Sequence, residues 1–163
     1  MKKNIRLILL LELLLFIVVF LVLVTNITPR GLHNISNFID IPSFLIIMLI
    51  LIPGLIIMGE WKDFIKSFSV GIKDFNLLEL KNIILAVDAA QKLTIYAALF
   101  SIISSAIIIL IKLSTNSQLI GPNLAVCFLS GFYAIIIEFL LLPLRLNAER
   151  KMNEEMDFED ESI

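Results

Sequence analysis

One carboxylate lies inside an apolar run near the carboxyl end of the sequence. Glu138 has Ile on one side and Phe and Leu on the other, and the nearest basic residue along the chain is Arg145. Seven residues of helix rise by about 10 Å, so in a membrane helix this carboxylate would lie within the hydrocarbon. A charge there costs roughly 2.5–3.5 kcal/mol unless it is neutral, paired or exposed to water. Glu138 is therefore predicted to be either a protonatable group on an ion path or a boundary carboxylate that pairs with Lys or Arg of a neighbouring helix.

Small and hydroxyl-bearing side chains recur at helical spacing along the last two apolar runs. In lipid, small residues let helix backbones approach closely, and hydroxyls turn toward other helices because lipid cannot solvate them. Each run is therefore predicted to turn this stripe toward sister chains or toward a polar path. The candidates for an ion path are Ser104, Ser105, Ser130 and Glu138. The candidates for close packing between copies of the chain are Ala97, Ser101, Cys127, Gly131 and Ala134.

The composition indicates an all-α, polytopic membrane protein. The chain has 163 residues, of which 59% are hydrophobic, and its mean hydropathy is +0.98. Four apolar runs have roughly the 20 residues needed to cross about 30 Å of hydrocarbon: about 5–25, 41–58, 93–113 and 124–144. Little of the chain remains for a soluble catalytic domain, so we do not expect an enzyme.

Apart from Arg30 and Lys112, which lie toward the other side, the basic residues lie on one side of these four runs. They precede the first, fill the segment 59–92 between the second and third, and follow the fourth: Lys2, Lys3, Arg6, Lys62, Lys66, Lys73, Lys81, Lys92, Arg145, Arg150 and Lys151. The positive-inside rule therefore predicts that both termini and the segment 59–92 are cytoplasmic. Glu12, in the first run, is expected to pair with this basic rim. Residues 152–163 are strongly acidic and are predicted to form a disordered tail.

Two local patterns predict where helices begin. Asp40 precedes Pro42 in a pattern typical of a helix start. Asn76 and Glu79 have the spacing of a capping box. No Pro or Gly interrupts residues 77–113, which predicts one long helix whose first part projects into the cytoplasm. The fourth helix is expected to continue past Arg145 in the same way.

Other classes of site find little support in the sequence. The chain has one cysteine and one histidine, so neither a disulfide within the chain nor a cluster of metal ligands is expected. No glycine-rich phosphate loop is present, and no basic face is large enough for nucleic acid. We therefore expect no metal, cofactor or nucleic-acid partner.

Three segments carry a family resemblance. They are residues 38–43 (FIDIPS) at the start of the second helix, residues 120–126 (IGPNLAV) at the start of the fourth, and residues 129–133 (LSGFY) followed by 142–144 (LPL). Together with the order of the apolar runs over about residues 5–151, they make the chain resemble the MotA/TolQ/ExbB proton-channel family. The resemblance is to its short MotA-like members.

This resemblance implies a homo-oligomeric ring, typically a pentamer, around a pore that holds helices of a single-span subunit of the MotB/TolR/ExbD type. It also implies that Ser104 or Ser105, together with Ser130, faces the ion-carrying carboxylate of that partner. The sequence departs from the family in having Ser104-Ser105 in place of Gly-Thr, and Ser130-Gly131 in place of paired threonines. The long cytoplasmic insertion of flagellar stators is missing, since about thirty residues join the second and third helices.

Two functions follow as hypotheses. The first is a stator-like subunit in the lipid of the bacterial cytoplasmic (inner) membrane, where it couples proton or sodium flow to mechanical work or transport. The second is a non-conducting membrane scaffold that kept the ring and lost the ion path. Glu138 and the polar stripes favour the first, whereas the reduced hydroxyl set and the missing insertion favour the second.

Overall fold

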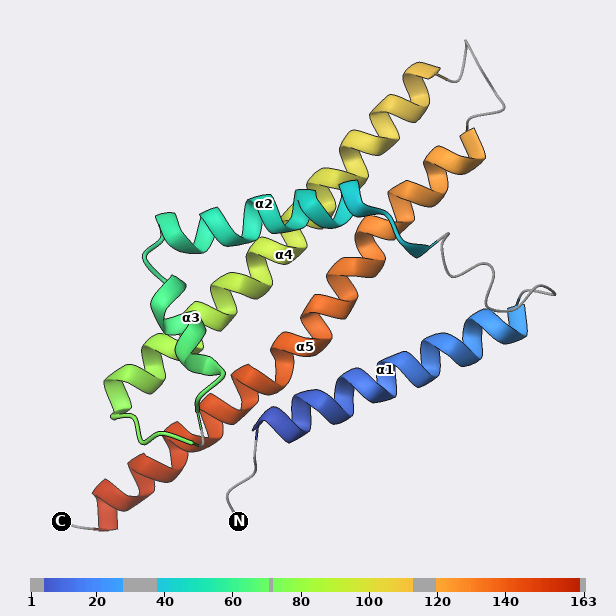
Figure 1. Ribbon diagram of the computed structural model, residues 1–163. Helices are drawn as coiled ribbons and strands as arrows, with labels where there is room; N and C mark the ends of the chain where they lie inside the picture. The colour runs from blue at the N-terminus through green and yellow to red at the C-terminus, as the bar shows by residue number, and fades with distance from the viewer. Residues whose placement is uncertain (1–4, 28–37, 71, 113–119, 162–163) are drawn as a thin grey trace.

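The protein consists of helices throughout the part of the chain that the structure describes. The computed structural model describes residues 5–27, 38–70, 72–112 and 120–161. Its helices are α1 (Ile5–Ile27), α2 (Ile41–Ile57), α3 (Trp61–Ser67), α4 (Leu77–Lys112) and α5 (Ile120–Glu161) (Figure 1). The prediction of an all-α protein is confirmed, and α4 is the long uninterrupted helix that the sequence predicted.

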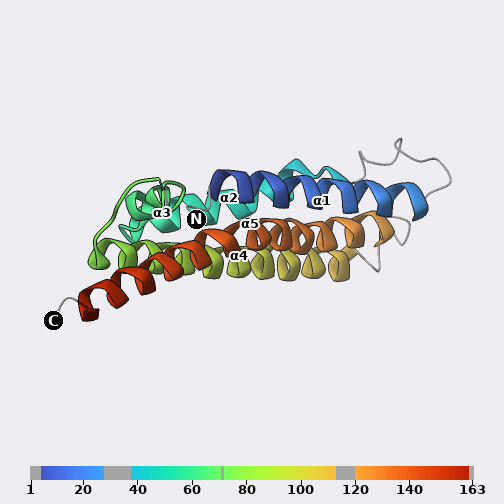
Figure 2. The ribbon, with the colours of Figure 1, turned by 90° about the horizontal axis from the view of Figure 1, so that it is seen from below.

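Helices α4 and α5 form a long antiparallel hairpin on which the other helices pack. Figure 1 shows α1 beside α5 and α2 crossing α4. In the view of Figure 2, α1, α2 and α3 lie together as one layer and the hairpin forms a second layer. One face of the hairpin is therefore covered by the chain itself, and the opposite face is uncovered.

Two of the helices are long and apolar enough to cross a membrane by themselves. These are α4 and α5, and a third span results if α2 and α3, which are bent by 110° at their junction, are counted together. Among the described side chains of α1, residues Leu7–Val22 form a shorter apolar stretch. The protein is thus a helical membrane protein with two to three spans by this measure, and the fourth predicted span stays a prediction.

The junction between α2 and α3 depends on a glycine. Gly59 has a φ of 80°, which is the left-handed region that side chains with a Cβ disfavour. The Glu60 N–H donates to the Leu55 carbonyl at 2.9 Å, and the Gly59 N–H donates to the Ile56 carbonyl at 3.1 Å. This pair of bonds is a Schellman motif, which ends a helix by satisfying its last carbonyls. The motif stops α2 and turns the chain into α3.

The helix starts follow the predicted capping patterns. The Ser43 N–H donates to the Asp40 carboxylate at 3.1 Å, at the beginning of α2. At the beginning of α4, the Glu79 N–H donates to the Asn76 side-chain oxygen at 2.8 Å, and the Asn76 N–H donates to the Glu79 carboxylate at 3.3 Å. Both expectations are confirmed.

The main core joins α2, α3, α4 and α5 near the predicted cytoplasmic boundary. Its buried residues are Leu51, Leu55, Phe64, Ala86, Val87, Ala90, Leu141 and Leu144. A Cβ on Gly54 would lie 2.9 Å from a methyl group of Leu93, so this glycine lets α2 approach α4 closely. A smaller cluster of Val70, Leu80, Ile83 and Ala148 continues the core toward the end of the hairpin where α4 begins.

At the other end, aromatic side chains hold α1 and the start of α2 against α5. The ring of Phe38 lies 5.1 Å from that of Phe20 and 6.1 Å from that of Phe132. The Tyr133 hydroxyl donates to the Phe38 carbonyl at 2.7 Å and accepts from the Asp40 N–H at 2.6 Å. These bonds fix the chain where it enters α2.

The acidic end of the chain differs from the expectation. Helix α5 continues to Glu161, whereas we expected a disordered tail from residue 152. Two ion pairs at i,i+4 spacing accompany this extension, Arg150–Glu154 at 3.7 Å and Lys151–Glu155 at 3.2 Å. Pairs at this spacing favour the helix, and the sequence argument had weighed only the repulsion among the acidic residues.

Replacing Gly59 with alanine is expected to destabilise the protein by about 1–2 kcal/mol, because the left-handed conformation is costly for a residue with a Cβ. Thermal unfolding in detergent, followed by the fluorescence of Trp61, measures the effect. Gly121→Ala is the matched control, since a Cβ there meets no atom within 4 Å. Equal stability of the two variants would contradict the assignment.

Candidate functional site

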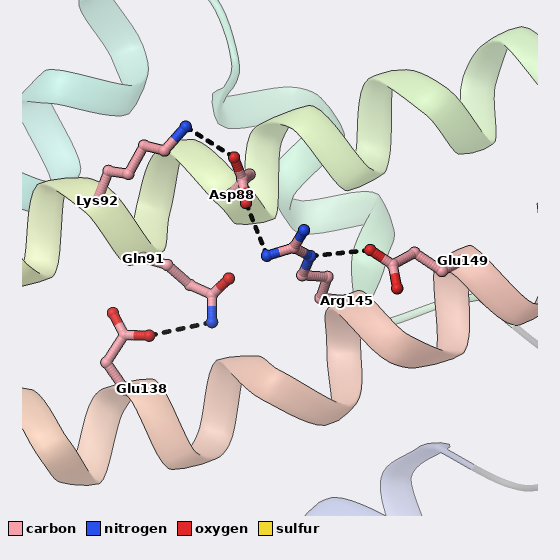
Figure 3. A network of polar contacts seen from close by, with 6 residues as sticks. All are labelled: Asp88, Gln91, Lys92, Glu138, Arg145 and Glu149. Atoms are coloured by element: carbon pink, nitrogen blue, oxygen red, sulfur yellow. Dashed lines mark hydrogen bonds and ion pairs between the residues drawn. The ribbon is translucent and has the colours of Figure 1, made fainter.

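Glu138 meets a neutral side chain. Gln91 of α4 donates a hydrogen bond from Nε2 to Glu138 Oε2 at 3.0 Å (Figure 3). Glu138 Oε1 is buried, and no hydrogen-bond donor reaches it from the described part of the chain. The same holds for Glu12 Oε2 on α1. The half-buried Glu138 carboxylate is therefore only half satisfied within one chain.

The neighbouring basic residues are paired elsewhere. Arg145 of α5 contacts Asp88 of α4 at 2.9 Å and Glu149 at 2.9 Å, and Lys92 contacts Asp88 at 2.9 Å. Figure 3 shows this ion-pair cluster beside the Gln91–Glu138 pair. The cluster thus uses the cation nearest to Glu138 along the chain, and pairing of Glu138 with Arg145 does not occur.

This cluster also changes the titration of a carboxyl group that precedes the predicted span 93–113. The hydrogen bond from Lys92 lowers the pKa of the Asp88 carboxyl below its ordinary value, and the positive charge of Arg145 adds to the effect. Asp88 is therefore ionised at neutral pH and ties the two helices together there.

A groove runs along the uncovered face of the hairpin and contains the Gln91–Glu138 pair. Its volume is about 550 Å³. The residues that line it come from α4 and α5 alone: Gln91, Ile95, Ala98, Leu99, Ile102, Gly131, Ala134, Ile135, Glu138, Phe139 and Leu142. The small residues among them leave room between the helices, so the carboxylate lies in an apolar groove that is open to the surroundings.

Most of the residues predicted to pack between copies are buried inside one chain. Buried side chains from α4 and α5 meet at the contact between the two helices: Ala97, Ser101, Cys127, Ser130 and Ala134. The Ser101 and Ser130 hydroxyls share a hydrogen bond of 2.7 Å, and the Cys127 thiol donates to the Ile102 carbonyl at 3.4 Å. The stripes therefore serve the α4–α5 contact, and only Gly131 and Ala134 of the packing candidates also reach the open groove.

The four ion-path candidates do not come together. Ser130 is fully buried against Ser101 and lies two helical turns from Glu138, about 12 Å by helical rise. Ser104 and Ser105 are half-buried on α4, farther toward its outer end, and do not line the groove. Glu138 alone of the four lies in the groove.

Sequence reasoning missed the partner of Glu138 and the ion pair beside it. Gln91 and Asp88 both precede the predicted span 93–113, and neither of them was assigned to the site from the sequence. The signal in the sequence that could have found them is a polar residue close to the boundary of an apolar run, a position that Glu138 and Arg145 also have on α5. Which of the polar residues at this boundary pair depends on how the two helices are aligned, and the sequence of either helix does not contain that alignment.

No protein-family model matches the chain, and no curated protein and no solved structure is significantly similar to it. The account of its function therefore rests on the geometry above and on the motifs in the sequence.

The hydrogen bond between Ser101 and Ser130 is expected to contribute about 0.6 kcal/mol, the average for interhelical bonds in membranes. A double-mutant cycle of Ser101→Ala and Ser130→Ala, measured by reversible unfolding in mixed micelles, isolates this term. The two changes together should cost less than their separate costs added. Strict additivity would show that the bond contributes nothing.

Asp88→Asn is expected to destabilise the protein at pH 7 by less than about 1 kcal/mol, because the ion pairs of Asp88 are partly exposed. A carboxyl whose pKa is lowered by folding stabilises the protein above its unfolded pKa of about 3.9 and loses this effect as the pH falls through the folded value. The difference between wild type and variant should therefore vanish in acid. A difference that is independent of pH would contradict the role of the charge.

Proposed function

We propose that the chain is a stator-like membrane subunit of the MotA/TolQ/ExbB type. In this proposal, copies of the chain form a ring, a single-span MotB/TolR/ExbD-like partner lies at its centre, and proton or sodium flow past Glu138 is coupled to mechanical work or transport. The observation that carries the proposal is the position of Glu138 in an open groove with one buried oxygen left without a donor.

The environment of Glu138 suits a group that exchanges a cation. A carboxylate neutralised by a fixed Arg or Lys has no need of a proton, but Glu138 is held by the neutral Gln91. An unpaired carboxylate at membrane depth is costly, so it gains by binding a proton or a sodium ion. The Arg145 guanidinium is held by its ion pairs with Asp88 and Glu149, so it does not neutralise Glu138.

The arrangement of the helices supports a defined orientation in the ring. The uncovered face of the α4–α5 hairpin is available for contacts inside the ring, where it can both meet a neighbouring copy and border a central pore, while α1 and α2 cover the other face (Figure 2). With 23 residues, α1 is about 34 Å long and can serve as a span of its own. The cluster of Asp88, Lys92 and Arg145 then marks the cytoplasmic boundary of a bacterial inner membrane, with both termini in the cytoplasm.

One observation favours the second candidate, a non-conducting scaffold. The Ser101 and Ser130 hydroxyls hydrogen-bond to each other, so neither lines an ion path. The groove beyond Glu138 is lined by apolar residues. A continuous polar route from Glu138 to the outer side would therefore need groups from a partner helix. A ring without such a partner would hold its copies together and conduct nothing.

Glu138→Gln is expected to reduce proton or sodium flux to the level of protein-free liposomes, because an amide takes up no proton near neutral pH. The purified chain, with its single-span partner where one is identified, is reconstituted under an imposed ion gradient, and a dye inside the liposomes reports the flux. Glu12→Gln is the matched control, since this second membrane carboxylate lies on α1 outside the groove.

Unchanged flux in Glu138→Gln would remove this residue from the ion path. Absence of flux in the parent chain, even together with the partner, would instead favour the scaffold.

A further inference from the structure

The site around Glu138 is incomplete within a single chain. Oε2 accepts from Gln91, while Oε1 is buried and has no donor in the described part of the chain. The groove is open on the face that α1 and α2 leave uncovered, so Oε1 comes within reach of a group from outside the chain when the Glu138 carboxylate turns toward the opening. Outside the described residues, such a donor can come from water, lipid or another protein chain.

The chain itself presents a free donor on another side of α4. Tyr96 is 64% exposed, and its hydroxyl makes no hydrogen bond within the described residues. It lines a shallow depression together with Lys92 and Asp88, which are paired with each other. Tyr96 follows Gln91 by five residues, so it lies about 8 Å farther along α4 by helical rise, within reach of a long side chain packed against a neighbouring helix.

Donor and acceptor cannot meet within one copy. Tyr96 follows Gln91 by five residues, which places the two side chains about 140° apart around α4 at 3.6 residues per turn. Tyr96 therefore lies on the edge of the hairpin, whereas Gln91 and Glu138 lie in the groove. The described part of one copy thus has an unsatisfied acceptor on one surface and an unused donor on another.

We propose that Tyr96 of a neighbouring copy of this chain donates its hydroxyl hydrogen to Glu138 Oε1 in the groove. The contact joins two different surfaces, and a contact of this kind repeats from copy to copy and closes into a ring when the rotation permits. Ala98, Gly131 and Ala134 leave space in the groove for the aromatic ring. The inference rests on the ring proposed above and adds that each Glu138 site is completed by the next subunit.

Chemical cross-linking in nanodiscs tests this contact. The native thiol is first removed with Cys127→Ala, and Tyr96→Cys and Glu138→Cys are then combined in one chain and treated with a short bis-maleimide. Each copy then carries both halves of the contact, so the expected product is a ladder of covalent oligomers up to the size of the ring. Each single-cysteine chain can form at most a dimer, because one thiol per chain allows one cross-link, so a ladder requires both cysteines.

A matched control pair keeps Tyr96→Cys and places the second cysteine at Leu11, an exposed position on α1. This pair should remain uncross-linked. In the otherwise unchanged protein, Tyr96→Phe deletes only the hydroxyl and should weaken association at least about threefold, as expected for one interhelical hydrogen bond. Native mass spectrometry measures the fraction of intact ring.

A missing ladder, a ladder that the α1 control reproduces, or unchanged association of Tyr96→Phe would each overturn the proposal. The outcomes are separable from those for ion flow. A ladder in a protein without flux would support this contact in a scaffold. Flux without a ladder would support the ion path through Glu138 and would exclude Tyr96 as its partner.

Discussion

The close approach of α4 and α5 is the constraint on which the rest of the structure depends. Lipid gives helices no hydrophobic reason to associate, so they are held by van der Waals packing and by hydrogen bonds between them. Ala97 and Ala134 allow the backbones to approach, and Ser101 and Ser130 share a bond in the middle of the contact. Because the smallest and most polar sides of both helices are used in this contact, Glu138 lies at its margin and opens into the groove.

The second consequence of this alignment is electrostatic. It places Asp88 of α4 opposite Arg145 of α5, and this pairing takes the cation nearest to Glu138 along the chain. Glu138 then meets Gln91, whose amide can satisfy one carboxylate oxygen and contributes no charge. The charged groups near the membrane boundary are therefore paired with each other, while a carboxylate about two turns nearer the start of α5 keeps the capacity to bind a cation or a donor from another chain.

Features that depend on neighbours in sequence were predictable. Asp40, Asn76 and Glu79 cap the helices as expected, because a cap involves only the first turn and its own backbone. The stripes of small residues on α4 and α5 were also recognised, but the sequence did not show that the two stripes face each other within one chain. Small side chains show which side of a helix can be approached closely, and they do not show whether the approaching helix belongs to the same chain. The helical end of α5 was missed because its i,i+4 ion pairs were not weighed against the acidic charge.

The sequence by itself determined that the chain is helical and membrane-embedded, where α2 and α4 begin, and that one carboxylate lies deep in an apolar run, since hydrophobicity and capping are local properties. Only the tertiary structure decided that Gln91 holds Glu138, that Asp88 takes Arg145, and that one face of the hairpin stays uncovered. These outcomes depend on the relative rotation and alignment of α4 and α5. Many side chains far apart in sequence set that alignment together, and no short segment contains it.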